Sequence, residues 1–436
     1  MGTSSTLATL VGTGGRAAAV SATRRFLVLH AELGVPRRRI ALYSHDTQGL
    51  GHVRRNISIA SALVESDPAT DVLLLTGAPE AAALPLPANT EIVTLPTLHK
   101  DVTGSYRPKT LGLPLTEVLG VRGQIVAAAL DAFAPDLFVV DKAVRGVHGE
   151  LDLALRALRG TSTTVVLGLR DVLDSPAATV QEWEATGTTA AIQDYYDEVW
   201  VYGDPQVFDA AAAYDWPWAV RRKLVYTGYL ADHRPDYRPP RSRPGGVEDQ
   251  PLVPTGPYVL CLVGGGQDGA ALAEAFVASP LPAGHHGVLV TGPYMSQQRR
   301  RSLAETASTR PELVVHGFTD RTHELVAGAR AAVTMGGYNS VCELLAARCP
   351  ALVVPRTVPR LEQAVRAAAL AQVGWVDTLH PDDLSPARIG TWLSRTVTRP
   401  RRMLGQIDLD GLVHLRQRAE ALLTDHHVEA EHHAAV

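Results

Sequence analysis

Residues 334–343, with the sequence TMGGYNSVCE, lie between two apolar runs, and this pattern predicts a strand, a glycine turn, a helix and a second strand. The two glycines let the backbone approach a ligand, and the helix start offers free N–H groups and a positive dipole end to a phosphate. An acid one turn inside the helix can accept hydrogen bonds from a ribose. We interpret the stretch as a nucleotide diphosphate site, although a packed turn with a surface acid would have the same residues. The candidate ligands are Gly336, Gly337, Asn339, Ser340 and Glu343.

Each half of the chain opens with a glycine turn directly after its first apolar run. The first turn contains Gly49 and Gly51 and ends in His52, and the second is the run GGGQDG at 264–269. Ligands of open α/β sheets bind beyond the carboxyl ends of the strands, so two such turns facing each other would form one site. The second turn can close over a diphosphate with its N–H groups, or it is a plain turn. Its candidate ligands are Gly264, Gly265, Gly266 and Gln267.

His52 is the candidate catalytic base. At the start of a predicted helix the dipole disfavours the imidazolium form, and a neutral imidazole can take a proton from an acceptor hydroxyl. A helix-capping or buried structural histidine is the alternative. Arg54 and Arg55 follow at once and can neutralise a phosphate on either substrate, or they lie on a solvated helix face.

Charged residues also follow two other apolar runs of the first half. Asp141 and Lys142 come after one run, and Arg170 and Asp171 come after the next. The carboxyl ends of strands are where this architecture places its sites, so these four residues are predicted on the acceptor side. Each can instead belong to a structural ion pair.

The second half holds further polar candidates. Phe318 follows an apolar run and can stack on a base, or it is a core aromatic. Glu362 and Gln363 begin a predicted helix and are suited to sugar hydroxyls, while Arg356 and Arg360 before them can offset diphosphate charge. The acid pair at 408–410 imitates a metal-binding DxD motif, but its place at a helix start favours a simple N-terminal acid pair.

Bulk properties narrow the class of protein. The chain has 436 residues, 46% of them hydrophobic, and a net charge of −4, which gives no electrostatic case for nucleic acid as a partner. Cys261, Cys342 and Cys349 have neither metal nor disulfide spacing, as expected in a reducing cytoplasm. No apolar run approaches the ~20 residues needed to span a bilayer.

Strand-like runs alternate with helical segments in both halves, which predicts parallel sheets covered on both faces. The expected fold class is α/β, with two doubly wound, Rossmann-like domains facing a central cleft. A stretch rich in Pro, Arg, Gly and Asp separates them. The predicted boundaries are a flexible N-terminal extension at 1–36, an acceptor-binding domain at 37–228, a linker at 229–257, a nucleotide-sugar-binding domain at 258–408, and a closing helix with a disordered tail at 409–436.

At this point the chain resembles the GT-B glycosyltransferases, in particular the MurG-like group of family 28. The segments SHDTQGLGH at 44–52 and MGGYNSVCE at 335–343 look still more like a bacterial group of predicted glycosyltransferases. The resemblance covers about Arg39 to Asp377, and the second half is its stronger part.

The resemblance implies roles for particular residues. His52 matches the histidine proposed as base or helix-dipole partner, and 264–269 matches the second glycine loop. Glu343 matches the acid that binds the ribose, and Glu362 with Gln363 matches the pair that contacts the sugar. Three departures put the acceptor in doubt: the first loop lacks the usual GGTGGH run, and Met335 and Arg366 replace an arginine and an asparagine.

The resemblance implies transfer of a hexosyl group from a nucleotide diphosphate sugar, UDP-linked by preference, to an unknown acceptor: a glycan, a lipid-linked molecule or a small molecule. The donor is a co-substrate, so no cofactor is expected, and fixed dipoles and cations make a metal unnecessary. One alternative is an epimerase of nucleotide sugars, with Asp46, Glu150 and Asp171 as acids. Another is a binding protein without catalysis, against which an intact set of site residues argues.

A membrane-surface role is a further hypothesis. Residues 111–119 are apolar and have Lys100, Arg107, Lys109 and Arg122 as basic neighbours. In the MurG-like group such a patch on the acceptor domain meets the bilayer, whereas weak amphipathic periodicity favours an ordinary packed loop. The expected location is cytoplasmic, with peripheral contact at the inner membrane face as the variant.

Overall fold

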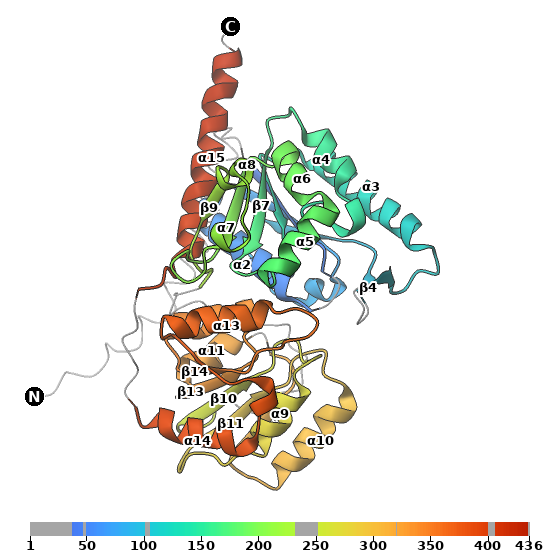
Figure 1. The fold of residues 1–436 in the computed structure, drawn as a ribbon. Helices are drawn as coiled ribbons and strands as arrows, with labels where there is room; N and C mark the ends of the chain where they lie inside the picture. Colours follow the sequence, from blue (N-terminus) through green and yellow to red (C-terminus); the bar gives the residue numbers. More distant parts are fainter. Residues whose placement is uncertain are drawn as a thin grey trace, which may run out of the picture.

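The computed structural model describes residues 37–46, 49–100, 105–231, 252–319, 321–399 and 406–434, with side chains to residue 424. The predicted extension at 1–36 and most of the predicted linker at 229–257 lie outside these ranges. The described residues form two α/β units, one above the other in Figure 1, as the sequence predicted.

The first unit contains a parallel sheet with the strand order β3-β2-β1-β6-β7-β8-β9. Its central strands are continuous apolar runs because helices cover both faces; all five residues of β6 are buried. The strands are β1 (Arg38–Ser44), β2 (Thr70–Thr76), β3 (Thr90–Thr94), β6 (Leu137–Asp141), β7 (Thr164–Arg170), β8 (Glu198–Tyr202) and β9 (Leu224–Tyr226). The helices are α2 (Gly51–Ser66), α3 (Leu115–Phe133), α4 (Asp152–Leu158), α5 (Pro176–Thr186), α6 (Thr188–Tyr195), α7 (Ala210–Ala213) and α8 (Trp218–Arg221), with 3-10 turns at Pro79–Ala83 and Val147–Gly149. An antiparallel hairpin of β4 (Leu98–Lys100) and β5 (Tyr106–Pro108) was not predicted.

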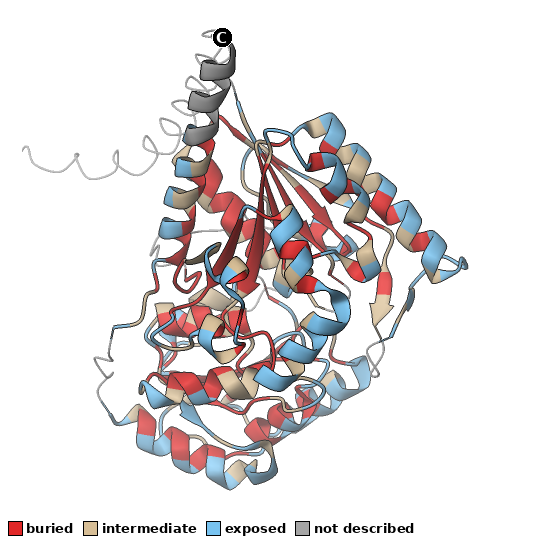
Figure 2. Cartoon of the chain, turned by 45° about the horizontal axis from the view of Figure 1, so that its top comes forward, coloured by how far each residue is buried: buried red, intermediate tan, exposed pale blue. Residues whose placement is uncertain are grey.

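The second unit repeats the plan with the order β12-β11-β10-β13-β14-β15, also parallel. Its strands are β10 (Tyr258–Leu262), β11 (His286–Val290), β12 (Leu313–His316), β13 (Ala331–Thr334), β14 (Ala351–Val353) and β15 (Asp377–Thr378). Its helices are α9 (Ala270–Val277), α10 (Gln297–Ser308), α11 (Thr322–Gly328), α12 (Tyr338–Ala346), α13 (Glu362–Gln372) and α14 (Pro386–Val397), with a 3-10 turn at Pro381–Asp383. In Figure 2 buried strands lie inside shells of helices whose outer faces are exposed.

Both sheets reverse their strand order at one point, and this decides where a ligand can bind. In the first sheet the reversal lies between β1 and β6, and in the second it lies between β10 and β13. A crevice opens beyond the carboxyl ends of the strands at such a switch point. The turn before His52 follows β1, and Asp141 ends β6; the turn at 264–269 follows β10, and the one at Gly336 follows β13. The topology therefore brings the predicted loops together in pairs.

The last helix, α15 (Gly411–Ala434), returns to the first unit (Figure 1). It packs on α2, Arg418 forms an ion pair with Glu198, and Asp410 pairs with Leu230 in an isolated β-bridge. The predicted closing helix is thus longer than expected: it is helical through Ala434, where the sequence suggested a disordered tail.

Candidate active site

His52 sits at the switch point of the first sheet, in the first turn of α2. Its Nδ1 contacts a carboxylate oxygen of Asp141, at the end of β6, and its side chain is 16% exposed. A ring N–H can donate to the carboxylate only from Nδ1, so this contact favours the tautomer whose Nε2 is free to accept a proton. Residues 47 and 48 of the predicted turn lie outside the described ranges.

Asp141 is held by Arg55 as well as by His52. The Arg55 guanidinium donates to both carboxylate oxygens of the buried Asp141, at 2.6–3.1 Å. Arg55 therefore has a structural partner instead of the solvated helix face considered as its alternative. Burial lowers the pKa of His52, and the Asp141 carboxylate opposes that shift. Despite the burial of Asp141, Arg55 and His52 hold the pKa of its carboxyl below its usual range.

The donor side follows β10 and β13. Gly266 has φ +89°, and a Cβ there would lie 2.2 Å from the Thr291 carbonyl oxygen, so only glycine fits. Gly264 and Gly265 are exposed and have room for a Cβ, and Gln267 is also exposed. The turn is therefore packed on one side and open on the other, as a loop closing over a diphosphate requires.

Helix α12 begins at Tyr338 with Gly337 as its N-cap residue and without a side-chain cap. Its first N–H groups are thus available to a ligand. Asn339 in this turn donates to the Gly51 carbonyl oxygen at 3.0 Å, directly before His52. The start of the donor helix and the start of the helix carrying the candidate base are therefore in contact across the two units.

Glu343 lies one turn further along α12, where it accepts a hydrogen bond from the Thr322 hydroxyl at 3.0 Å. Burial raises the pKa of its carboxyl. Phe318, 40% exposed, has the Arg54 guanidinium 5.9 Å from its ring centroid. The contact of these two residues with a base and a ribose stays a prediction.

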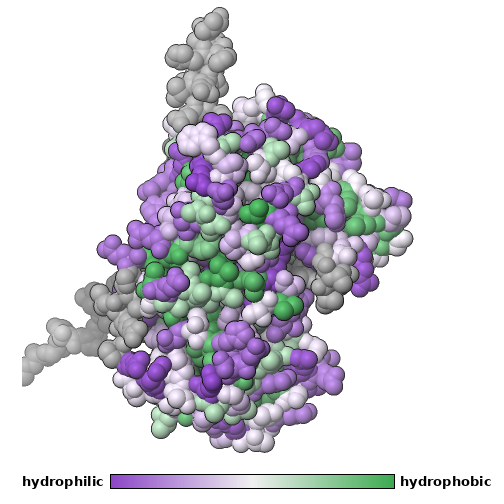
Figure 3. Space-filling model, in the orientation of Figure 1, coloured by the Kyte–Doolittle hydropathy of each residue, from purple (hydrophilic) through white to green (hydrophobic). Residues whose placement is uncertain are grey.

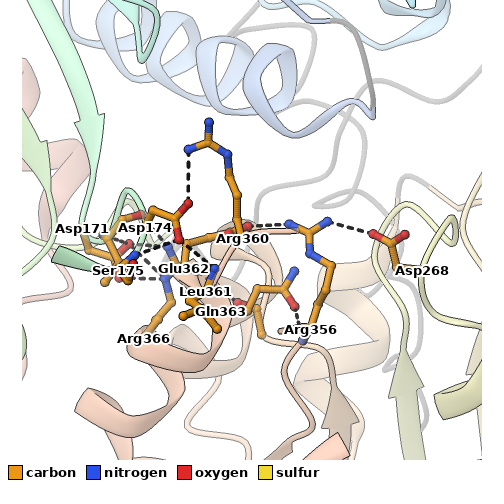
Figure 4. Close-up of polar contacts among 12 residues, drawn as sticks. Asp171, Asp174, Ser175, Asp268, Arg356, Arg360, Leu361, Glu362, Gln363 and Arg366 are labelled. Carbon is orange, nitrogen blue, oxygen red and sulfur yellow. Dashed lines mark hydrogen bonds and ion pairs between the residues drawn. The ribbon is translucent and has the colours of Figure 1, made fainter. Parts of the chain in front are cut away.

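Arg356, in the loop before α13, bridges two acids (Figure 4). It donates to Asp268 of the glycine turn at 264–269, at 2.8 Å, and to Glu362 at 2.6 Å. The Gln363 side-chain oxygen accepts from the Arg356 backbone N–H at 2.9 Å. In this state Glu362 and Gln363 shape the loop, and their contact with a sugar stays a prediction.

Two predicted residues, Arg360 and Asp171, lie at the junction of the units. Arg360 forms hydrogen-bonded ion pairs with Glu182 of α5, at 3.0 and 3.1 Å, so its predicted diphosphate role would need these contacts to open. Arg366 binds Asp171 at 2.6–3.0 Å in a fully buried pair (Figure 4). Both carboxylate oxygens of Asp171, which was predicted on the acceptor side, thus accept hydrogen bonds from the other unit. The sequence did not predict this contact between the units.

A pair of substitutions tests the packing of the glycine turn at 264–269. We expect Gly266→Ala to destabilise the fold by roughly 1–3 kcal/mol, because the new methyl group meets a carbonyl oxygen at a positive φ. Gly265→Ala is the matched control: its Cβ would meet only Tyr294, at 3.5 Å. Thermal melts of both variants check this, and equal melting temperatures would contradict the assigned loop geometry.

No group of three or more His, Cys, Asp or Glu side chains is arranged to hold a metal ion within the described ranges. Among the described helices, none combines the length and the apolar character that crossing a bilayer demands.

Comparison with known proteins gives matches to the second unit in sequence and to the whole chain in fold. Residues 259–404 match the Glycosyltransferase family 28 C-terminal domain. The chain is 31% identical over 127 residues to the UDP-N-acetylglucosamine–N-acetylmuramyl-(pentapeptide) pyrophosphoryl-undecaprenol N-acetylglucosamine transferase of Prochlorococcus marinus (strain NATL1A), which covers 28% of this chain and 35% of that relative. The chain thus spans about a third of the length of the curated relatives it matches.

Two solved structures have the same arrangement of both units. The calicheamicin glycosyltransferase CalG4 aligns with a TM-score of 0.51 at 18% identity, over 91% of this chain and 98% of that one. UGT71G1 of Medicago truncatula, complexed with UDP-glucose, aligns with a TM-score of 0.56 at 12% identity, over 87% and 93%. The two sheets, their switch points and these alignments define a two-domain protein of the GT-B glycosyltransferase fold. Within that fold, residues 259–404 are similar to the Glycosyltransferase family 28 C-terminal domain.

Proposed function

We propose that this protein transfers a hexosyl group from a nucleotide diphosphate sugar to an acceptor hydroxyl. The observation that carries the proposal is the contact between the Asn339 side chain and the Gly51 carbonyl. It sets the His52–Asp141 pair of the first unit beside the start of α12 in the second. A base and an anion-binding helix start on opposite sides of one junction are the two parts that such a transfer needs.

In the proposed reaction Asp141 orients His52 through its Nδ1, and Nε2 takes the proton of the acceptor hydroxyl. The hydroxyl oxygen forms the new bond to the anomeric carbon as the bond to the diphosphate breaks. The N–H groups at the start of α12 and of the 264–269 loop receive the charge that develops on the leaving diphosphate. We propose that these dipoles and nearby cations act without a metal; activity that survives EDTA supports this.

The epimerase alternative loses support from the placement of its acids. Asp171 is bound to Arg366, and Glu150 is fully buried against Arg122 and Tyr43. Asp46 accepts from the Thr76 hydroxyl, and burial raises the pKa of its carboxyl. All three acids are therefore engaged in buried contacts that a moving substrate proton would have to disrupt.

We propose uridine diphosphate as the nucleotide part of the donor. A UDP-sugar is named in the enzyme from Prochlorococcus and in the complex of UGT71G1. Glu343, at the depth in α12 where a ribose would lie above Gly337, supplies the carboxylate for its hydroxyls.

A thermal-shift screen against UDP, TDP, GDP and ADP tests the donor proposal. UDP at 100 times its Kd should stabilise the protein by about 2.7 kcal/mol, because it binds only the folded state. Glu343→Ala should abolish most of that shift, whereas Glu420→Ala on the surface of α15 should not. No stabilisation by any nucleotide at millimolar concentration would sink the glycosyltransferase proposal.

Peripheral membrane contact remains a proposal with a narrower basis than the sequence suggested. Leu111, Leu113 and Val121, before and on α3, are 43–45% exposed. Arg122, counted as a basic neighbour of this patch, is instead buried in an ion pair with Glu150. We expect the wild-type protein to float with anionic liposomes, and the double variant Leu111→Ser with Leu113→Ser to float less. Equal flotation of wild type and variant, or no flotation of either, argues for an ordinary surface loop.

A further inference from the structure

The charged side chains at the junction of the two units are paired almost throughout. Four arginines there have a carboxylate within hydrogen-bonding distance, which is what burial of a charge demands. The pairs are Arg55 with Asp141, Arg366 with Asp171, Arg360 with Glu182 and Asp174, and Arg356 with Glu362 and Asp268.

Lys142 and Arg170 depart from this pattern. Lys142 directly follows β6 and Arg170 ends β7, and the two strands are neighbours; the Lys142 backbone N–H donates to the Gly168 carbonyl at 2.8 Å. Both side chains are half-buried, and neither makes a hydrogen bond or ion pair with any described side chain. The Nε of Arg170 is buried without a partner.

The carboxylates around these two cations are already engaged. Glu362, 4% exposed, faces both, but one of its oxygens accepts from Arg356. Its other oxygen is buried and has no hydrogen-bond partner, so a single carboxylate near the two cations makes no hydrogen bond with either of them. Glu182 lies near Lys142 and binds Arg360, and Asp141 lies near Arg170 and binds Arg55 with His52.

The pKa shifts of the two side chains are those expected beside other positive charges. Burial and the neighbouring Arg170 and Arg360 hold the pKa of Lys142 well below its usual range. Burial, with Arg366 and Arg55 nearby, lowers the pKa of Arg170 to about 10. Two cations that lack their own carboxylate and repel each other destabilise the empty protein, and a bound anion would relieve that repulsion.

We propose that Lys142 and Arg170 form a subsite for a carboxylate or phosphate group carried by a substrate close to the reacting hydroxyl. The position follows from the chain: Lys142 is adjacent to Asp141, which holds the candidate base His52, and Arg170 ends the neighbouring strand β7. The residues of this subsite are other than those at the start of α12, where the donor diphosphate is proposed to bind.

This inference deepens the proposed function and rests on it. Two sources can supply the anion: a donor whose sugar carries a carboxylate, or an acceptor that carries a phosphate or carboxylate beside its hydroxyl. The recognised chemistry is the same in both cases, since the two side chains present a point charge and a planar fork to one anionic group.

The test compares wild type with Lys142→Asn and Arg170→Gln in two binding assays by calorimetry. Asn suits position 142 because the backbone there is left-handed, with φ +66°. The first assay compares UDP-glucuronate with UDP-glucose, and the second titrates inorganic phosphate into protein saturated with UDP. Arg145→Gln, which removes an exposed arginine paired with Asp152 in the same loop region, is the matched control.

If the donor sugar carries the anion, UDP-glucuronate should bind at least about 10-fold more tightly than UDP-glucose, because each charge-assisted contact contributes about that factor. Both variants should lose this difference. An anionic acceptor predicts no such preference, but phosphate binding to the UDP complex that either variant weakens by about 10-fold. The control should match wild type in both assays.

The subsite is overturned if wild type neither prefers UDP-glucuronate nor binds phosphate, or if the variants bind both as wild type does. A second readout separates a binding role from a structural one: removing either unpaired cation should leave the melting temperature equal or higher, whereas a fall would assign the residue to the fold. Failure of UDP itself to bind would count against the proposed function, and the phosphate titration without UDP would still test the subsite.

Discussion

Glycosyl transfer by the His52→Ala variant should be about 10²–10⁴-fold slower than in wild type, while UDP binding is unchanged. The loss follows from removing the group proposed to take the acceptor proton, and general-base catalysis contributes roughly this factor. UDP binding survives because His52 lies on α2 and the donor loops lie in the other unit. Turnover of a UDP-sugar with a panel of hydroxyl acceptors, beside UDP titrations, makes the measurement.

The pH profile adds an independent readout for the same site. Burial lowers the pKa of His52, so the neutral base persists below the usual histidine range, and the acid limb of the kcat profile should lie below about pH 6.5. Asp141 raises the pKa of His52. In Asp141→Asn that support is gone, so the limb should move to still lower pH while the plateau rate falls.

A surface histidine provides the control, because His99→Ala on β4 removes an imidazole without touching Asp141. It should retain the wild-type rate and profile. Full activity in His52→Ala would reject His52 as the base. Release of a 2-epimer without any acceptor would instead point to the epimerase reaction.

Replacing Arg366 by methionine should destabilise the protein by about 3–5 kcal/mol, the largest stability effect we expect. The change leaves the Asp171 carboxylate buried without a partner. In wild type Asp171 raises the pKa of Arg366 in spite of burial. Chemical denaturation followed by fluorescence and by far-UV circular dichroism gives the free energy of unfolding.

The double variant Asp171→Asn with Arg366→Met distinguishes an uncompensated charge from lost packing. Removing both charges should recover most of the stability, because two neutral groups need no ion pair. The exposed pair Arg221–Asp215 serves for comparison, and Arg221→Met should cost under about 1 kcal/mol. Equal losses from the buried and the exposed arginine would refute the assigned contact between the units.

The fold could be predicted from the sequence because its signals are local. Long apolar runs such as 137–141 and 258–262 alternate with helical periods, and they became β6 and β10. The short edge strands β9 and β15 were missed, since Leu224–Tyr226 and Asp377–Thr378 have too few residues for a pattern.

The site was predictable only where a residue follows its own glycine turn or strand. His52 and Asp141 were both singled out, yet nothing in a single sequence couples positions 89 residues apart into one contact. Arg366 stood out only as a departure from the family pattern, and its partner Asp171 is 195 residues away. Pairings of this kind depend on how the two units dock, which motifs do not encode.

The return of α15 to the first unit also limits how the two domains can move. The chain leaves that unit near Tyr229 and comes back near Asp408. Two backbone hydrogen bonds join these crossings: the Tyr229 N–H donates to the Asp408 carbonyl at 2.8 Å, and the Gly411 N–H donates to the Tyr229 carbonyl at 3.1 Å. The Leu230 N–H also donates to the Tyr338 hydroxyl, at the first residue of α12. Hydrophobic side chains gather where the domains meet on the face seen in Figure 3. Because the two crossings are joined at one place, we expect the domains to rotate about a single axis that passes through it. Leu230, which belongs to this place, contacts the helix proposed to hold the donor.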